Sequence, residues 1–189
     1  SANSPIKLFN HVRIRVSTFV FKLRCKTLRK RVSWGKNLRI VGKLVIRGPG
    51  RVILGDNVTV GMTVTPWTYH PDAVIRIGNK VHLNGTRFAC QKQVSVGDNS
   101  IIAECRIMDT NFHSTYINRH DPRAPVKVAP VTIGDNVWIS ADCYILPGAN
   151  IGKNSVIGIN SIVTGNIPQD SLACGNPAKA VKSLSFYEA

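Results

Sequence analysis

Residues 133–168 read IGDNVW, ISADCY, ILPGAN, IGKNSV, IGINSI, VTGNIP, with an aliphatic residue at every sixth position. Looser copies begin at Leu54, Ile77 and Val96. A period of six is neither the 3.6 of a helix nor the two of a strand. It predicts a chain that turns a corner every six residues, with Gly, Asn and Asp at the corners and aliphatic side chains inside. Three sides close a coil of about 18 residues, and stacked coils form three parallel sheets around an aliphatic column.

The composition is that of one folded domain with an appendage. The chain has 189 residues, of which 43% are hydrophobic, so it has enough apolar surface for a core. No apolar run approaches the roughly 18 residues that a membrane-spanning helix needs. The five cysteines show no CxxC or zinc spacing, which is typical of reduced thiols in a cytoplasmic protein.

The positive charge is concentrated at the N-terminus. Residues 1–55 hold fourteen of the 25 lysines and arginines and no acidic residue, whereas residues 56–189 are almost neutral. We therefore expect a basic arm, residues 1–35, which its apolar spacing predicts to be helical. Such an arm can cap the open end of the solenoid, bind an anionic inner-membrane surface, or do both. A nucleic acid is the less favoured partner.

Four segments carry a resemblance to a known family: IGDNVWIS, ILPGANIGKNSVIG, SIVTGNIP and ACGNPAKAVKSL. They resemble the hexapeptide-repeat acyltransferases over about residues 50–184, most closely the maltose and galactoside acetyltransferases and the O-acetyltransferases of polysaccharide biosynthesis. The resemblance implies an all-β, left-handed parallel β-helix, here residues 36–167. It also implies a homotrimer, with each active site shared by two subunits.

The repeat is interrupted after Met108 by a turn-rich segment, and we expect a loop at residues 109–127. The resemblance places the catalytic base of the family at His113. A neutral imidazole can take the proton of a sugar hydroxyl as it attacks a thioester. His120 is the alternative base. Asp109 is expected either to orient the imidazole or to be a solvent-facing corner residue.

The resemblance also implies an asparagine at the reacting centre, which matches Asn84. The alternative is a corner asparagine, since Gly85 follows it. The family has an acidic residue soon after this position for acceptor binding, but here the chain reads CQKQ, residues 90–93. This departure argues against a simple maltose-like or galactoside-like acceptor.

The acetyl-CoA positions of the family match residues in the last coils and the tail. In the family, Trp138, Ser140 and Ala141 meet the pantetheine arm and the acetyl group, and a backbone N–H near Ser140 or Ala141 is the expected oxyanion donor. Ile159 matches a pantetheine contact. Thr164 and Gly165 match a Thr-Lys pair that meets the phosphates, but here glycine replaces the lysine.

After residue 168 we expect a tail, residues 168–189, with a short helix that packs on the last coil. The resemblance places coenzyme A phosphates on Lys179 and Lys182, which would share one helical face. No metal is expected.

The sequence therefore predicts an acetyl-CoA-dependent O-acetyltransferase acting on a sugar or glycan by direct transfer. N-acetylation of an amino or nucleotide sugar remains open, as does a non-enzymatic scaffold with a membrane-binding or nucleic-acid-binding arm. A γ-type carbonic anhydrase shares this fold, but His82, His113 and His120 do not have the spacing of its zinc ligands. The expected location is the cytoplasm, with peripheral binding to the inner membrane through the arm.

Overall fold

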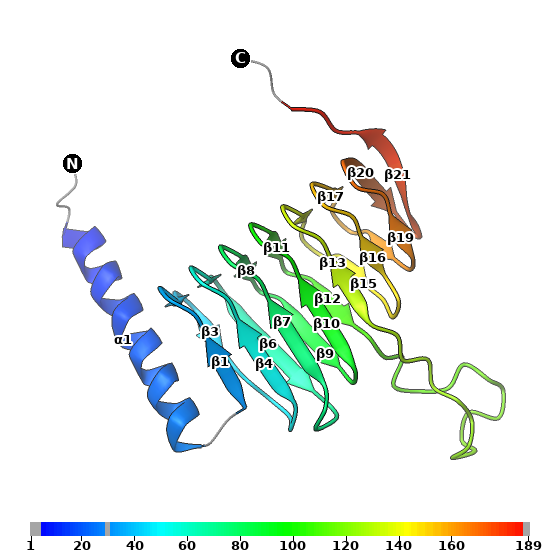
Figure 1. Cartoon of the computed structure of the whole chain (residues 1–189), viewed down its shortest axis with the longest axis horizontal. Coiled ribbons are helices and arrows are strands. Elements are labelled where there is room, and N and C mark those ends of the chain that lie inside the picture. Colours follow the sequence, from blue (N-terminus) through cyan, green and yellow to red (C-terminus); the bar gives the residue numbers. More distant parts are fainter. Residues whose placement is uncertain (1–4, 29–30, 187–189) are drawn as a thin grey trace.

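The computed structural model describes the backbone of residues 5–28 and 31–186, and side chains from residue 12 onward. One helix, α1 (Pro5–Thr27), is followed by short strands that stack coil upon coil (Figure 1). Successive strands of one coil belong to three different sheets, and each strand pairs in parallel with the strand one coil later. The architecture is a parallel β-helix, as the repeat predicts, and it agrees with the left-handed form that the family resemblance implies.

Three sheets form the walls of the solenoid. The first sheet contains β1 (Val32–Trp34), β4 (Arg51–Leu54), β7 (Val74–Ile77), β10 (Gln93–Val96), β13 (Val131–Ile133), β16 (Asn150–Ile151) and β19 (Asn166–Ile167). The second contains β2 (Arg39–Ile40), β5 (Thr59–Val60), β8 (His82–Asn84), β11 (Ile101–Ala103), β14 (Trp138–Ile139), β17 (Val156–Ile157), β20 (Ser171–Gly175) and β21 (Ala178–Ser183). The third contains β3 (Lys43–Leu44), β6 (Thr63–Thr68), β9 (Arg87–Cys90), β12 (Arg106–Met108), β15 (Tyr144–Ile145) and β18 (Ile162–Val163).

The inside of the solenoid is the predicted aliphatic column. In the second sheet, Ile102, Ile139 and Ile157 are stacked in register, and each is fully buried. Burying one such side chain contributes about 1.5–3 kcal/mol, so the repeated isoleucine specifies both the register and most of the stability.

Asparagine occupies the corners that follow the first sheet. Asn57, Asn99, Asn136 and Asn154 all have φ between 53° and 60°, a left-handed conformation that asparagine tolerates better than most residues. Side chains one position earlier bind the coil below: the Asp98 carboxylate accepts a hydrogen bond from the Asn79 N–H at 2.7 Å. The corners are therefore tied together along the whole solenoid.

Helix α1 covers the open end of the first coils, as the capping interpretation expects. The buried Thr18 hydroxyl accepts a hydrogen bond from the Ile40 N–H at 3.0 Å. Cys25 is buried, and the ring of Phe21 packs edge-on against Trp34 at 6.0 Å. The helix thus satisfies a donor at the edge of the second sheet, which would otherwise be exposed.

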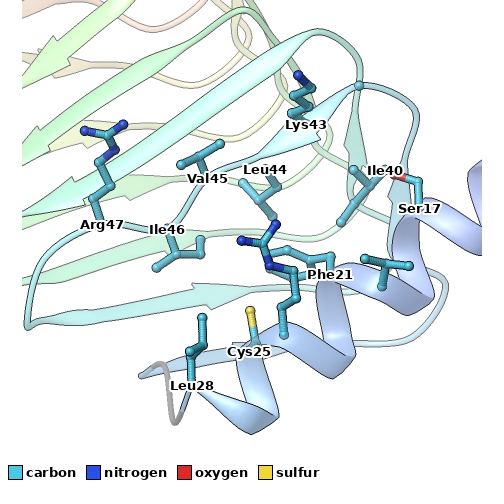
Figure 2. Close-up of a pocket in the computed structure, with 13 residues that line it drawn as sticks. Ser17, Phe21, Cys25, Leu28, Ile40, Lys43, Leu44, Val45, Ile46 and Arg47 are labelled. Carbon is cyan, nitrogen blue, oxygen red and sulfur yellow. The ribbon is translucent and has the colours of Figure 1, made fainter.

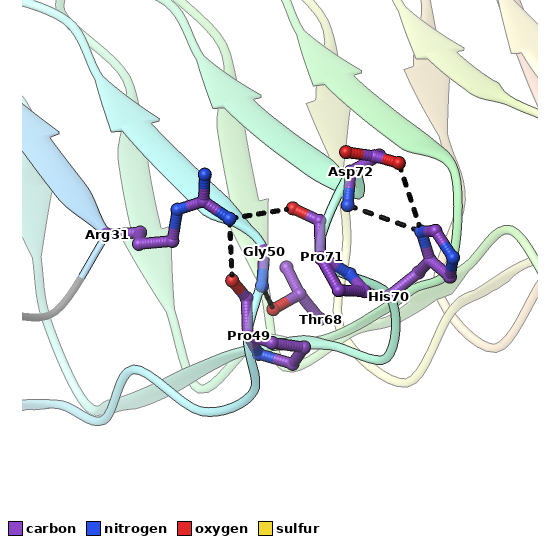
Figure 3. A network of polar contacts seen from close by, with 7 residues as sticks. All are labelled: Arg31, Pro49, Gly50, Thr68, His70, Pro71 and Asp72. Carbon is purple, nitrogen blue, oxygen red and sulfur yellow. Dashed lines mark hydrogen bonds and ion pairs between the residues drawn. The ribbon is translucent and has the colours of Figure 1, made fainter.

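A wider turn follows β6, and hydrogen bonds fix it to its neighbours (Figure 3). Arg31 donates to the carbonyl oxygens of Pro49 and Pro71 at 3.4 and 3.1 Å. The buried Thr68 hydroxyl accepts from the Gly50 N–H at 2.8 Å. This turn holds Trp67 and Tyr69 in place beside the loop described below.

The predicted C-terminal helix is wrong. Residues 171–183 instead form an antiparallel hairpin, β20 and β21, in which Cys174 pairs with Lys179 and Leu172 with Lys182. The reason is that β20 continues the second sheet by pairing with β17, and Gly175, with φ of 102°, allows the chain to reverse. Residues 187–189 of the expected tail lie outside the described part of the chain.

Candidate active site

The interruption of the repeat is a loop between β12 and β13, as predicted (Figure 1). Its base is a short antiparallel ladder. The Asn111 N–H donates to the Lys127 carbonyl at 3.0 Å, the Ala129 N–H donates to the Asp109 carbonyl at 2.9 Å, and Thr110 is bridged to Val128. The rigid solenoid therefore fixes both ends of the loop.

Asp109 is fully buried at the base of the loop and organises the neighbouring corner. Its carboxylate accepts hydrogen bonds from the N–H groups of Gln91, Lys92 and Gln93, each at 2.7 Å. Burial, together with the adjacent Asp109 carboxylate, raises the pKa of the Cys90 thiol. The structure gives Asp109 no contact with the His113 imidazole, and its oxygens are used in holding residues 91–93. The solvent-facing alternative for Asp109 is therefore wrong, and its role in orienting the imidazole stays a prediction.

His113 lies on an exposed, tightly turned segment just beyond the base. Its N–H donates to the Asn111 carbonyl at 2.7 Å. The preceding Phe112 has φ of 63°, rare and strained for a residue with a bulky side chain. The Phe112 ring is held edge-on against Tyr69 at 4.8 Å. The backbone of the exposed His113 is thus held next to an aromatic cluster, whereas His120 lies farther along the loop and is also exposed.

A second group of predicted residues lines one edge of the solenoid, between the second and third sheets. Asn84 is in register with Ala103 of the next coil. Two residues after Ala103, the Cys105 thiol donates to the Ser140 carbonyl of the following coil at 3.2 Å. One coil on, the Asn160 N–H donates to the Ala141 carbonyl at 3.1 Å, next to Ile159. Asn84, Ser140, Ala141 and Ile159 therefore follow one another along this edge, as expected.

The hydrogen bonds of these residues limit what they can do. The Ser140 N–H donates to the Ile157 carbonyl at 3.0 Å, so it is not the oxyanion donor that we expected. The Ala141 N–H has no hydrogen-bond partner within the described part of the chain, and it remains the candidate. The Asn84 amide oxygen accepts from the Met62 N–H at 2.8 Å, which leaves its amide nitrogen for another partner.

The remaining cofactor candidates are exposed but do not share one edge. Trp138 is 50% and Ile159 67% exposed, although both are large and apolar. Lys179 and Lys182 are exposed on β21, on the hairpin that ends the second sheet. Thr164 and Gly165 follow β18, at the corner that leads into the first sheet, away from Ile159. The structure therefore places Trp138, Ile159 and the lysines along the second sheet, with Trp138 at its border with the first sheet and Ile159 at its border with the third. It separates Thr164 and Gly165 from them.

The two parts of the predicted site lie on different edges of the triangular solenoid. The His113 loop leaves the edge between the third and first sheets, whereas Asn84, Ser140, Ala141 and Ile159 lie between the second and third. The whole width of the third sheet separates them within one chain. A single subunit does not bring the expected base and the expected cofactor residues together.

Sequence reasoning missed the outer face of the third sheet, between these two edges. Arg87 and Arg106 are in register there. Trp67 stacks on Tyr69 at 5.1 Å, with their ring planes 13° apart, and the Arg47 guanidinium lies 5.1 Å from the centre of the Trp67 ring. The alternation of aromatic residues in TVTPWTY, residues 63–69, and the equivalent positions of the two arginines in successive coils were the available signals.

The described residues contain neither a metal-ligand cluster nor a membrane-spanning helix. No group of three or more His, Cys, Asp or Glu side chains in the described part of the chain is placed to hold a metal ion, so the zinc alternative lacks a ligand set there. None of the helices in that part is long and apolar enough to cross a membrane.

Comparisons with known proteins agree with this architecture. The family model described as bacterial transferase hexapeptide (six repeats) matches residues 130–165. A putative lipopolysaccharide biosynthesis O-acetyl transferase, WbbJ of Escherichia coli K12, is 29% identical over 161 residues, which cover 79% of this chain and 81% of that protein. The galactoside O-acetyltransferase of the same organism is 32% identical over 124 residues, 61% of this chain and 60% of the enzyme. The chain is therefore similar to hexapeptide-repeat acetyltransferases along most of its length.

The coverage of the relatives varies. The aligned part is under two thirds of the galactoside enzyme and only 29% of a putative acetyltransferase of Saccharomyces cerevisiae. Among solved structures, AntD, an N-acyltransferase from Bacillus cereus in complex with dTDP and 3-hydroxybutyryl-CoA, superimposes with a TM-score of 0.74. It is 21% identical and covers 87% of this chain and 88% of its own. This likeness shows a shared fold.

Proposed function

We propose that this protein is an acetyl-CoA-dependent O-acetyltransferase that acts on a hydroxyl of a sugar or glycan. The observation that carries the proposal is His113, exposed on a loop whose base is fixed by a hydrogen-bonded ladder and by the buried Asp109 carboxylate. Its closest functional support is the similarity to WbbJ and to galactoside O-acetyltransferase. A glycan precursor of a surface polysaccharide is the acceptor that these relatives suggest.

His113 is the proposed general base. As the acceptor hydroxyl attacks the thioester carbonyl, a new C–O bond forms and the imidazole takes the hydroxyl proton. The C–S bond then breaks, and the thiolate leaves with that proton, so no covalent enzyme intermediate is needed. The Ala141 N–H is the candidate donor to the oxyanion.

The exposed residues along the second sheet fit acetyl-CoA. Trp138 and Ile159 offer uncovered apolar surface for a flexible arm, and Lys179 and Lys182 offer cations for phosphates. The order along the second sheet, from apolar residues to cationic ones, matches a ligand that is apolar at one end and anionic at the other. The two lysines that we expected on a helix lie on the β-hairpin that ends the second sheet, and there they are the proposed phosphate-binding residues.

We also infer that the active enzyme is a homotrimer. The third sheet separates His113 from Asn84 and Ala141 within one chain, and a neighbouring subunit can remove this separation. Each site would then combine the His113 loop of one subunit with the cofactor edge of the next. Sedimentation as a stable monomer with full activity would refute the shared site.

The decisive experiment measures thiol release from acetyl-CoA with a panel of sugars, nucleotide sugars and glycan acceptors. His113→Ala should lower acceptor-dependent release by about 10²–10⁴-fold, the usual contribution of a general base. His120→Ala, on the same loop and also exposed, is the matched control and should keep near-normal release. If the control loses activity and His113→Ala does not, the base has been assigned to the wrong histidine.

The same reaction distinguishes O-acetylation from N-acetylation of an amino sugar. An O-acetyl ester is removed by mild alkali, whereas an N-acetyl amide is retained. An alkali-stable product on an amino sugar would replace the O-acetyltransferase with an N-acetyltransferase.

We further propose that α1 binds the anionic inner surface of the cytoplasmic membrane. One side of the helix packs on the solenoid through Thr18 and Cys25, while Val16 and Phe19 on the other side are 56% and 66% exposed. An apolar groove between α1 and the first coils is lined by Phe21, Leu28, Leu44 and Ile46, among other residues (Figure 2). Exposed apolar side chains on a helix without acidic residues are typical of an interfacial helix.

Cosedimentation of the full chain with vesicles tests this proposal. Phe19→Glu should reduce binding to vesicles that contain anionic lipid, whereas Phe186→Glu, at a still more exposed aromatic near the C-terminus, should not. Equal binding by the wild type and both variants would limit α1 to its capping role.

A further inference from the structure

The outer face of the third sheet joins the two edges that carry the candidate site. Thr65, Arg87 and Arg106 are in register on β6, β9 and β12, and Tyr144 follows on β15. Strands in a sheet are about 4.8 Å apart, so these outward side chains form a close column. Glu104 and Asp142 stand at the edge near Asn84, and Phe112 stands at the edge of the His113 loop.

The arginines of this face have no carboxylate partner. Within the described part of the chain, salt bridges join only His70 to Asp72 and Arg123 to Asp121. Arg87 and Arg106 are nevertheless directly opposite each other, and like charges opposite each other destabilise a sheet. Glu104 and Asp142 line the same hollow but form no salt bridge with either arginine, so both guanidinium groups are free to bind an external anion.

Aromatic side chains continue the face toward the loop. Trp67 and Tyr69 are stacked, and Phe112 closes the cluster beside His113. Arg47 covers the Trp67 ring. Burial raises the pKa of Tyr69, while the charges of Arg87 and Arg47 act in the opposite direction, so both guanidinium groups lie near the phenol.

Two hollows on this face have both arginines in common. One is lined by Trp67, Tyr69 and Phe112, and the other by Glu104, Asp142 and Tyr144; Arg87 and Arg106 line both. The resulting groove is aromatic near His113, cationic at its centre and acidic at its far end. Aromatic faces suit sugar rings, guanidinium groups suit a phosphate or a carboxylate, and carboxylates accept hydrogen bonds from hydroxyls.

We propose that this groove binds the acceptor, and that the acceptor is a saccharide carrying a phosphate or carboxylate group next to the sugar that is acetylated. Arg87 and Arg106 bind the anionic group, and Trp67, Tyr69 and Phe112 contact the sugar. The inference rests on the proposed function, because it takes the groove beside His113 as the acceptor side. It also explains how the chain can lack the acidic residue that the family uses for neutral acceptors.

Calorimetric titration of the full-length protein tests the binding without requiring turnover. The probes are glucose, glucuronic acid, glucose 1-phosphate and UDP-glucose, with coenzyme A titrated separately. We expect at least one anionic sugar to bind about tenfold more tightly than glucose, and Arg87→Gln with Arg106→Gln to remove that preference while leaving coenzyme A affinity unchanged. Glucuronic acid and the phosphorylated sugars distinguish a carboxylate from a phosphate.

The matched control is Arg76→Gln, an exposed arginine in the middle of β7 on the first sheet. Loss of the preference in this control would indicate general electrostatic attraction and overturn the site. Equal binding of glucose and every anionic sugar would overturn it as well. If the double variant weakens coenzyme A instead, the arginines bind the phosphates of the cofactor. Sedimentation of the variants shows whether their oligomeric state is unchanged. If no acceptor supports thiol release from acetyl-CoA, the proposed function fails, but the binding results still test the groove.

Discussion

Replacement of Asp109 by asparagine should destabilise the fold as well as the loop. The carboxylate is fully buried and accepts three backbone hydrogen bonds from residues 91–93, all at 2.7 Å. Asparagine keeps one oxygen, which can serve two of these donors, but its amide group then faces the third. Losing one hydrogen bond to a charged acceptor and leaving one partly buried N–H unpaired costs about 2–3 kcal/mol. For a chain of this size that lowers Tm by on the order of 10 °C.

Thermal unfolding followed by circular dichroism measures the change, with Asp121→Asn as control. Asp121 lies on the same loop, but its partner Arg123 is exposed, so solvent screens the pair and the same substitution should change Tm little. If Asp109→Asn left Tm equal to that of the control while it lowered kcat and changed the pH profile, then Asp109 would orient the imidazole in solution. That result would refute the structural role argued here.

Three further predictions concern the solenoid itself. Ile139→Ala opens a cavity in a fully buried column and should cost about 2–5 kcal/mol in denaturant unfolding; a cost under 1 kcal/mol would mean that the column collapses around the gap. Hydrogen bonds from Asn79 hold the pKa of Asp98 below its ordinary value, so its stabilising contribution is complete above about pH 4 and is lost as pH falls through the lower folded value. Asp98→Asn should therefore flatten the fall of Tm between about pH 5 and pH 2, and an unchanged slope would contradict this. Thr18→Val removes the acceptor of the Ile40 N–H and should speed hydrogen exchange at that amide, whereas unchanged protection would show that α1 does not cap the second sheet.

The sequence was sufficient for the solenoid because its energetics repeat. Each hexad contributes one inward aliphatic residue, and each corner needs a residue that tolerates positive φ. These two demands recur from Asn57 to Asn154 and leave a visible period. The prediction of a C-terminal helix was wrong because it rested on the helical spacing of Lys179 and Lys182. The conformation of the tail is instead determined by the pairing of β20 with β17 and β21. Such long-range pairing outweighs local spacing.

The candidate site was predictable only in part. His113 and the edge residues followed from motifs, but the role of Asp109 depends on three N–H groups from another coil, which no local pattern shows. The same is true of the Arg87–Arg106 column. Its members are 19 residues apart and become neighbours only when the coils are stacked.

The separation of inward and outward positions has a consequence for substrate choice. In β9, β10 and β12 buried residues alternate with exposed ones, so an outward side chain can change without altering the aliphatic column. A solenoid can thus lose the acidic residue that binds the acceptor in the family and carry arginines on neighbouring strands instead, at little cost in folding free energy. The charge of the acceptor should then be set by the outer face of the third sheet, while His113 and the cofactor edge retain the chemistry. Under the proposed function, Arg87 and Arg106 would determine which sugar is acetylated, and His113 would determine whether acetylation occurs.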